Sequence, residues 1–465
     1  MKFFDKKKVG ILLTVAILFI AQLIPESGSL SGAAINSMAL FISAIVLWVC
    51  ESFPMCISAL ALMMIMPYFG VMKLGEVWPS FGGSAFFFVM ATFALTASIE
   101  NSTYPTRFIG WLVNISKGDS KKLIYGFMIG AAVLSSIMSN MATAIMFISI
   151  SLILIKANGN PEKGKSNFAK CMLIGVPAAA NIGGFMTLAG TPTNIMGVEL
   201  LDSMLGIKVS FVQWMVVGVP VGLLCTILAA MVITKIFKPE PLAQEAIEFY
   251  EESKKQLPPL TGKEKKTLII IVTMFVLWIL GSWISVLNTA VVAILGIAVM
   301  MLPGIDVLTW DEYSGKTDWN TCMVIGAVPV LVQGMIVTGA SQWLVDTVFG
   351  EIGNWSWIAI ALFVGLFACV LRNFIPTGVA NFALLSVPII QLAQSTGTSP
   401  TAMIMMIAFW CLVILVLPFD PIYLISYGSG YYKVKDTAKS GIPLSLILVV
   451  VTGVLIPLLA KVIGF

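Results

Sequence analysis

The 465-residue sequence contains no histidine and few charged residues. Without histidine, the protein can have neither a histidine proton relay nor a histidine metal site. Its 7 cysteines lie in or beside apolar runs and form no CxxC pair, so we predict neither a disulfide nor a metal site. There is no HExxH motif, no GxSxG motif in a suitable context, and no pair of acids within one apolar run. These absences argue against an intramembrane enzyme.

Only 11% of the residues are charged, whereas 58% are hydrophobic and the mean hydropathy is +0.98. This composition is typical of a polytopic membrane protein. The formal net charge of +4 reflects basic loops and gives no case for nucleic-acid binding. The first apolar run, 10–24, follows four lysines and imitates a signal peptide, but no persuasive cleavage site follows it. We therefore predict that residues 1–35 form a cytoplasmic segment and a retained first helix.

Charged flanks divide the remaining apolar runs into full crossings and two hairpins. Basic residues at 117–122 and 156–170 stand on both sides of 123–157, so both of its ends should be cytoplasmic. That segment is predicted to enter and leave on one side of the membrane. The flanks of 356–394 carry no lysine or arginine, so a second hairpin should enter from outside. About eleven crossings then remain, with the amino terminus inside and the carboxyl terminus outside.

The two halves of the chain are predicted to be inverted repeats. Segment 83–114 resembles 321–348 in pattern, and each is followed by a hairpin and then by a helix that proline interrupts. An odd number of crossings separates equivalent elements, which inverts the second copy. We assign 36–236 to the first repeat, 267–465 to the second, and 237–266 to a cytoplasmic linker.

Polar or proline-containing breaks interrupt both halves at corresponding places, at 139–143, 190–194, 377–381 and 418–421. Broken backbone at membrane depth is tolerated where it is buried in protein or lines a watery cavity. Matching breaks in the two halves indicate where a transporter binds its substrate. We therefore predict a central site formed by all four breaks.

The first hairpin tip offers groups for both an anion and a cation. Helix N-termini at Ser139, Asn140 and Thr143 present backbone N–H groups that suit a carboxylate or another oxyanion. Hydroxyl and carbonyl oxygens suit a small cation such as sodium. The alternative is that these polar residues only cap the hairpin helices.

The second half carries two ionisable residues near its breaks, Arg372 and Asp420. Ionisable side chains inside a membrane span are candidates for function by default. Asp420 could be a titratable carrier, or Arg372 could bind an anionic substrate. Alternatively, the two residues pair with each other and brace the hairpin.

These motifs resemble those of the divalent anion–sodium symporter family, whose members carry dicarboxylates, citrate and sulfate. The resemblance rests on the Ser-Asn-x-x-Thr tip at 139–143, the Gly-Thr-Pro-Thr-Asn break at 190–194, Trp48-x-x-Glu51-x-x-Pro54 and the segment 421–430. It implies a homodimer in which a mobile transport domain moves past a fixed scaffold. It also implies that a sodium ion binds at Ser139, Asn140 and Gly190, and that the same tip faces the substrate carboxylate.

The sequence departs from the family pattern at three places. Met141 stands where the first tip of the family has threonine, and the second tip, 377–381, has lost its Ser-Asn pair. Asp420 replaces an uncharged residue in the second break. By the resemblance, the first cation site is kept in part and the second is rebuilt.

Together, these observations predict an all-α integral membrane carrier with inverted repeats in the cytoplasmic membrane. It would move a small anion, for which a C4-type dicarboxylate is the leading candidate. The movement would be an elevator-like alternation coupled to sodium, protons or a counter-anion. An inorganic oxyanion or a monocarboxylate is the alternative substrate, and a channel is a further rival. No cofactor is expected beyond sodium as a coupling ion. The predicted substrate contacts are Ser139, Asn140, Thr143, Thr193, Asn194, Arg372, Thr377, Gly378 and Asn381, and the predicted cation contacts are Ser139, Asn140, Gly190, Ala380 and Asp420.

Overall fold

The structure, a computed structural model, describes residues 5–27, 30–243, 259–284, 286–348, 355–375, 377–418 and 420–465. Within these ranges every regular element is helical, which confirms the all-α prediction. Seven of the described helical segments are long and apolar enough to cross a membrane. The helices are α1 (Lys6–Ala21), α2 (Gly32–Val49), α3 (Met55–Ile65), α4 (Ser84–Glu100), α5 (Tyr104–Ser116), α6 (Ser120–Ser135), α7 (Asn140–Ala157), α8 (Asn167–Gly184), α9 (Pro192–Leu205), α10 (Phe211–Phe237), α12 (Gly262–Leu280), α13 (Thr289–Met301), α14 (Trp310–Lys316), α15 (Trp319–Val337), α16 (Ala340–Val348), α17 (Trp357–Arg372), α18 (Gly378–Thr396), α19 (Pro400–Leu412), α20 (Pro421–Tyr427) and α21 (Val434–Val462), with short 3-10 turns η1 (Met66–Phe69), η2 (Leu74–Glu76), η3 (Pro79–Gly82) and η4 (Leu188–Gly190).

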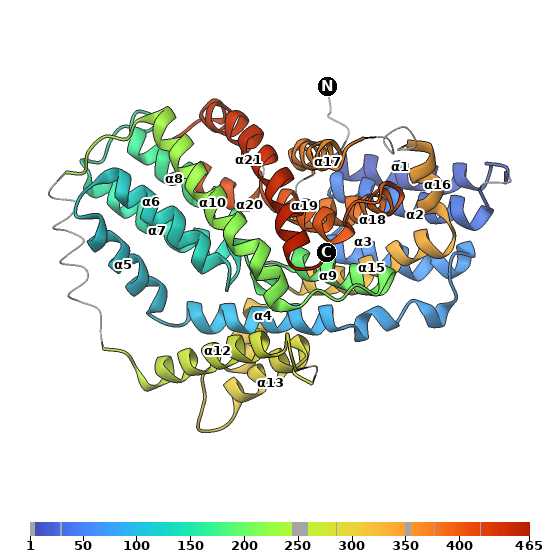
Figure 1. Cartoon of the computed structure of the whole chain (residues 1–465), viewed down its shortest axis with the longest axis horizontal. Coiled ribbons are helices and arrows are strands. Elements are labelled where there is room, and N and C mark those ends of the chain that lie inside the picture. Colours follow the sequence, from blue (N-terminus) through green and yellow to red (C-terminus); the bar gives the residue numbers. More distant parts are fainter. Residues whose placement is uncertain are drawn as a thin grey trace.

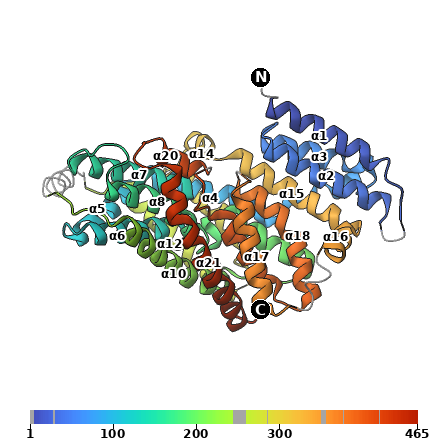
Figure 2. The ribbon, with the colours of Figure 1, turned by 90° about the horizontal axis from the view of Figure 1, so that it is seen from above.

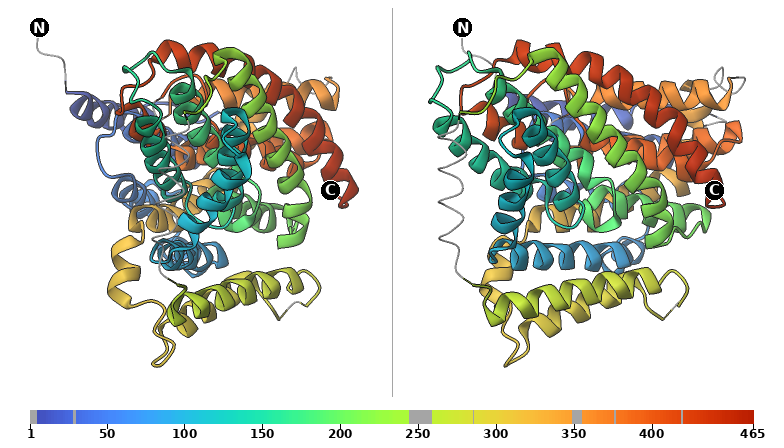
Figure 3. Two further views of the ribbon diagram at one scale, coloured as in Figure 1. Left: turned by 90° about the vertical axis from the view of Figure 1, so that its left-hand side faces the viewer. Right: turned by 60° about the vertical axis from the view of Figure 1, so that its left-hand side comes forward.

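One group of helices comes from the start of each half. Helices α2 and α3 pack against α15, and α1 packs on α2 at one end of the molecule (Figure 2). Helix α4 packs against α13, and α12 and α13 form an outer layer beside it (Figures 1 and 3). These elements, with α14 and α16, are called the scaffold group below.

Apart from α5, the remaining helices follow one order twice. In the first half, the hairpin α6–α7 precedes the broken pair α8 and α9 and the long α10. In the second half, the hairpin α17–α18 precedes the broken pair α19 and α20 and the long α21. Helix α8 packs against α6, α7 and α10, and α19 packs in the same way against α17, α18 and α21. This repetition is the arrangement that the inverted-repeat interpretation predicts.

The halves of the two broken helices are exchanged between the repeats. Helix α9, from the first half, packs against α18 and α19 of the second, and α20, from the second half, packs against α7 and α8 of the first. Each hairpin therefore lies beside a helix that begins at the other repeat's break. The exchange brings all four breaks to one place. The two hairpins, the two broken pairs and the two long helices are called the hairpin group below, namely α6, α7, α8, α9, α10, α17, α18, α19, α20 and α21.

Some elements differ from the sequence interpretation in their limits. Segment 321–348 of the sequence falls in two helices, α15 and α16, because Gly339 adopts a left-handed conformation with a φ of 76° between them. Helix α5 is a separate amphipathic helix after α4. Of the predicted linker, residues 244–258 lie outside the described part of the chain, as do 350–354 and Phe419. The domain boundaries stay predictions.

Candidate functional site

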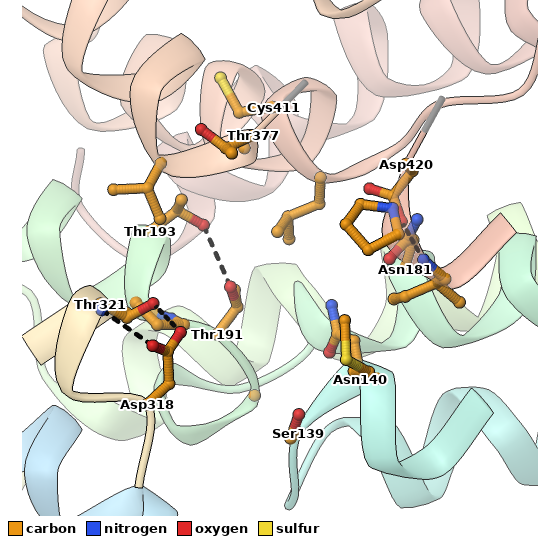
Figure 4. Close-up of a pocket in the computed structure, with 18 of the residues that line it drawn as sticks. Ser139, Asn140, Asn181, Thr191, Thr193, Asp318, Thr321, Thr377, Cys411 and Asp420 are labelled. Carbon is orange, nitrogen blue, oxygen red and sulfur yellow. Dashed lines mark hydrogen bonds between the residues drawn. The ribbon is translucent and has the colours of Figure 1, made fainter. Parts of the chain in front are cut away.

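The breaks converge on a cavity of about 260 Å³ between the two hairpin tips. Figure 4 shows Ser139 and Asn140 on one side of it, with Thr377 and Cys411 across from them. Its described lining residues are Thr92, Phe93, Thr96, Ser139, Asn140, Met141, Asn181, Ala189, Gly190, Thr191, Pro192, Thr193, Asp318, Thr321, Arg372, Thr377, Gly378, Val379, Cys411, Leu412, Asp420, Pro421 and Ile422.

Four long helices begin at this cavity, namely α7, α9, α15 and α18. Helix N-termini carry partial positive charge and unpaired N–H groups, which favour an anion nearby. Asp318 caps α15 and Thr377 caps α18 with side-chain hydrogen bonds. The N-cap residues of α7 and α9, Ser139 and Thr191, make no such bond. The first half therefore presents the N-termini that are open to a ligand.

The first tip is held by hydrogen bonds and close contacts with neighbouring residues. Ser135 Oγ lies 2.7 Å from both Asn140 Oδ1 and the Ala180 carbonyl oxygen. The Ser139 amide donates to Thr96 Oγ1 at 3.0 Å. A Cβ at Gly184 would come within 2.6 Å of the Asn140 amide, so Gly184 leaves room for that side chain in its present position. Asn140 is thus positioned at the cavity by its neighbours.

The first break is tied together by a buried asparagine. Asn194 Nδ2 donates to the carbonyl oxygens of Gly184 at 2.8 Å and Thr187 at 2.7 Å. A Cβ at Gly190 would lie 2.4 Å from the Gly184 oxygen. Asn194 therefore fixes the backbone of the break from the protein interior, while Gly190 and Thr193 lie at the cavity wall. The neutral oxygens of Ser135, Asn140 and the Gly190 region are the kind of donors that suit a small hard cation.

In the second half, Arg372 and Asp420 form a buried ion pair. Their side chains are 2% and 9% exposed, and Arg372 Nη2 lies 2.5 Å from Asp420 Oδ2. Arg372 Nη1 also donates to the Ile375 carbonyl oxygen at 2.7 Å, and Asp420 Oδ1 accepts from the Ile422 amide at 2.9 Å. The pair joins the end of α17 to the start of α20 across the second break. This geometry is the pairing alternative of the sequence analysis, and both residues also line the cavity.

The structure brings most predicted site residues together and leaves four outside the lining. Ser139, Asn140, Gly190, Thr193, Arg372, Thr377, Gly378 and Asp420 line the cavity. Thr143, Asn194, Ala380 and Asn381 are buried and are not among its lining residues. Their side chains point from the first turns of α7, α9 and α18 into the protein interior. Roles for these four as direct ligands stay predictions.

Three groups of polar lining residues were not predicted from the sequence. Asn181 is 3% exposed and lies beside the Asp420 carboxylate (Figure 4), and its Nδ2 makes no hydrogen bond of standard geometry to the described residues. Asp318 and Thr321 come from the start of α15, and Thr92 and Thr96 come from α4. An asparagine inside the apolar run 171–200 is a signal that could have identified Asn181. The lining residues of α4 and α15 could not be identified in this way, because only tertiary packing brings them to the cavity.

Comparisons with known proteins agree with this architecture. The family described as "Sodium:sulfate symporter transmembrane region" matches residues 5–464. The sodium-dependent dicarboxylate transporter SdcS of Staphylococcus saprophyticus is 24% identical, over 95% of this chain and 89% of that protein. An uncharacterized transporter of Haemophilus influenzae is 25% identical, over 90% of each chain.

Two solved transporters share the fold. MtrF of Neisseria gonorrhoeae, described among antimetabolite efflux pumps, superposes with a TM-score of 0.57 at 12% identity, over 98% of this chain and 95% of that one. The YdaH transporter of Alcanivorax borkumensis gives a TM-score of 0.57 at 12% identity, over 99% of each chain. At these identities the likeness concerns the fold alone.

Proposed function

The chain belongs to the sodium:sulfate symporter family of membrane transporters, and from that premise we propose that it carries a small carboxylate anion by secondary active transport. One observation supports the anion most directly. The uncapped N-termini of α7 and α9 meet the Asn140 and Asn181 side chains at a single cavity. C4-type dicarboxylates are the first substrates to test, because SdcS proteins are named for dicarboxylate transport.

The coupling proposal follows from the different chemical groups that the two halves place at the cavity. The first tip offers neutral oxygens that suit one sodium ion, whereas the second half already contains a buried cation in Arg372. The Arg372 guanidinium is part of the protein and does not cross the membrane down a concentration gradient. It therefore cannot drive accumulation of the substrate. We propose that coupling uses one sodium at the first tip, or a proton or counter-anion, and does not require a second cation at the second tip.

The transport cycle is proposed to be elevator-like, with the hairpin group moving past the scaffold group as part of a homodimer. By the predicted topology, α3 and α15 begin at the cytoplasmic side. The Thr377 hydroxyl lies 3.5 Å from Met55 Sδ at the start of α3, and Asp318 at the start of α15 lines the cavity. A hairpin that enters from outside therefore reaches the cytoplasmic ends of two scaffold helices. This arrangement supports an inward-facing state.

Counterflow in proteoliposomes tests the function. Liposomes loaded with an unlabelled anion should accumulate the same labelled anion transiently if the protein is a carrier. A thermal-shift screen of malate, succinate, fumarate, citrate, 2-oxoglutarate, sulfate and monocarboxylates, with and without sodium, selects the anion. Downhill equilibration without counterflow would indicate a channel and contradict the proposal.

Imposed gradients test the coupling. Uptake is measured with a sodium gradient, a pH gradient or an internal anion, in wild type and in Asp420→Asn. If sodium alone drives accumulation and the variant keeps the same sodium and pH dependence, Asp420 has a structural role only.

A further inference from the structure

The two hairpin tips differ in the groups that they present to the cavity. Ser139 and Thr377 are the N-cap residues of α7 and α18, so Asn140 corresponds to Gly378 and Met141 to Val379. The first tip therefore offers an amide at the position where the second offers no side chain. Both tips offer an apolar side chain one residue later, and both of these residues line the cavity.

The second tip has no space for an amide. A Cβ at Gly378 would lie 2.7 Å from the Cys411 carbonyl oxygen, at the end of α19. Because that atom is backbone, a longer side chain at Gly378 would require α19 or α18 to shift. Val379, Leu412 and Ile422 supply apolar lining nearby. The Thr377 hydroxyl is already engaged, since it accepts from the Ala380 amide at 3.3 Å and contacts Met55 Sδ.

The charges around the cavity also distinguish its two sides. Among the described lining residues, the cationic side chain is Arg372, and it is engaged by Asp420 and by the Ile375 carbonyl oxygen. Asp318 adds a carboxylate that caps α15. The second half therefore offers no uncompensated positive group to a second substrate carboxylate. A buried anion without such a partner is strongly disfavoured.

The first half, in contrast, offers hydrogen-bond donors at the cavity. The N-termini of α7 and α9 lack side-chain caps, and Asn181 Nδ2, buried at the cavity beside Asp420, makes no hydrogen bond of standard geometry to the described residues. A carboxylate placed among these groups would accept hydrogen bonds that the protein does not otherwise satisfy. One anionic group at the first tip is thus favoured by both charge and hydrogen bonding.

We infer that the cavity recognises one carboxylate at the first tip and an uncharged end at the second, so that the bound form is a monoanion. This inference rests on the proposed function and narrows its substrate class. The ligands that fit are short monocarboxylates, C4 acids with an amide or a methyl at the far end, and the half-protonated form of a C4 dicarboxylate.

A series of equal length tests the inference. Succinate, succinamate and butyrate share four carbons but carry a carboxylate, an amide or a methyl at the second end. In counterflow at about pH 7.5, succinamate and butyrate should compete at least about tenfold better than succinate, because a second charged carboxylate would lose its hydrogen bonds to water without replacement. Lowering the pH should improve competition by succinate more than by succinamate, since it generates the monoanion.

A variant identifies which tip receives the uncharged end. Val379→Thr adds a hydroxyl at the second tip with little change in volume, and should raise competition by succinate relative to butyrate. Val370→Thr, on an exposed position of α17, is the matched control and should leave the ratio unchanged.

The outcomes separate this inference from the proposed function. Stronger competition by succinate than by both analogues at about pH 7.5 would overturn the single-carboxylate site and leave anion transport standing. An unchanged ratio in Val379→Thr would overturn the assignment of the uncharged end to the second tip. Counterflow with none of the anions screened would overturn the proposed function and this inference with it.

Discussion

In the proposed anion site, Asn140 is the side chain expected to matter most, because it lies at the tip of α7 and is fixed by Ser135 on one side and Gly184 on the other. Asn140→Ala should reduce uptake at least about tenfold, the effect of removing one hydrogen bond to a charged ligand. The protein should still insert and purify, since helix α7 keeps its backbone hydrogen bonds. Asn114→Ala, on an exposed position of α5, is the control. Full uptake by Asn140→Ala would show that the first tip is only a cap.

The Arg372–Asp420 pair is predicted to act as a unit in stability. Replacing one partner leaves the other charge buried and uncompensated, which typically costs about 3–5 kcal/mol. Asp420→Asn and Arg372→Gln should each lower the unfolding temperature in detergent. The double variant should recover much of the loss, because both charges are then absent. A double variant whose loss equals the sum of the two single losses would show that the residues do not stabilise each other.

Among the elements, the corner between α4 and α5 is joined to α12 by the Glu264 carboxylate. Glu264 accepts hydrogen bonds from the hydroxyl and amide of Thr103, both at 2.6 Å, and from the amide and hydroxyl of Thr261 at 2.7 and 2.9 Å. These donors, with the Thr103 hydroxyl first, lower the pKa of Glu264 from 4.5 to about 2. Because the folded pKa is lowered, the stabilisation is present above the ordinary pKa and is lost as the pH falls towards about 2.

Thermal unfolding in detergent at a series of acidic pH values measures this effect. Wild type should lose stability between about pH 5 and pH 2, and Glu264→Gln should show a shallower decline over that interval. Glu162→Gln, in an exposed pair with Lys165, is the control and should follow wild type. Parallel curves for wild type and Glu264→Gln would contradict the role given to this carboxylate.

The first hairpin is predicted to enter and leave on the cytoplasmic side. Single cysteines at Asp119, which caps α6, and at Gly164, after α7, should both react with a membrane-impermeant maleimide only from the cytoplasm. The background lacks the native cysteines, and inside-out and right-side-out vesicles distinguish the faces. Labelling of the two positions from opposite faces would exclude a re-entrant hairpin.

Local signals predicted the elements better than they predicted the contacts between them. Pro192 and Pro421 lack the amide that a continuous helix needs, so the breaks before α9 and α20 could be placed from sequence. The exchange of α9 and α20 between the repeats could not, because no local pattern states which helix covers an apolar face. From the sequence, Gly378 marked the loss of the Ser-Asn pair at the second tip. The Cys411 carbonyl oxygen beside it gives the physical reason, and it becomes visible only when α18 and α19 are packed.

At the scale of the whole molecule, separate side-chain hydrogen bonds join the hairpin group to the scaffold group. Thr377 contacts Met55, and Ser84 Oγ on α4 donates to Glu199 Oε2 on α9 at 3.0 Å. The Ser139 amide donates to Thr96 Oγ1 on α4, and Gln391 Nε2 on α18 donates to Ser341 Oγ on α16. Contacts inside each group are more extensive, as between α6 and α8 or between α15 and α3. Two bodies with more extensive packing inside each than between them are suited to sliding past each other, which the elevator proposal requires.

A pair of cysteines across this boundary should therefore stop transport when it is cross-linked. Met55→Cys with Thr377→Cys, in a background without the native cysteines, places two thiols where the side chains now lie 3.5 Å apart. Mercury ions should abolish counterflow in this variant, and excess thiol should restore it, because the link joins the scaffold to the moving tip. The matched control keeps Cys56 and adds Asn320→Cys, where the Cys56 amide and Asn320 Oδ1 are 2.9 Å apart within the scaffold group. That pair should cross-link without loss of transport. If the first pair cross-links fully and counterflow continues, the second hairpin does not leave α3 during the cycle, and the elevator proposal is wrong.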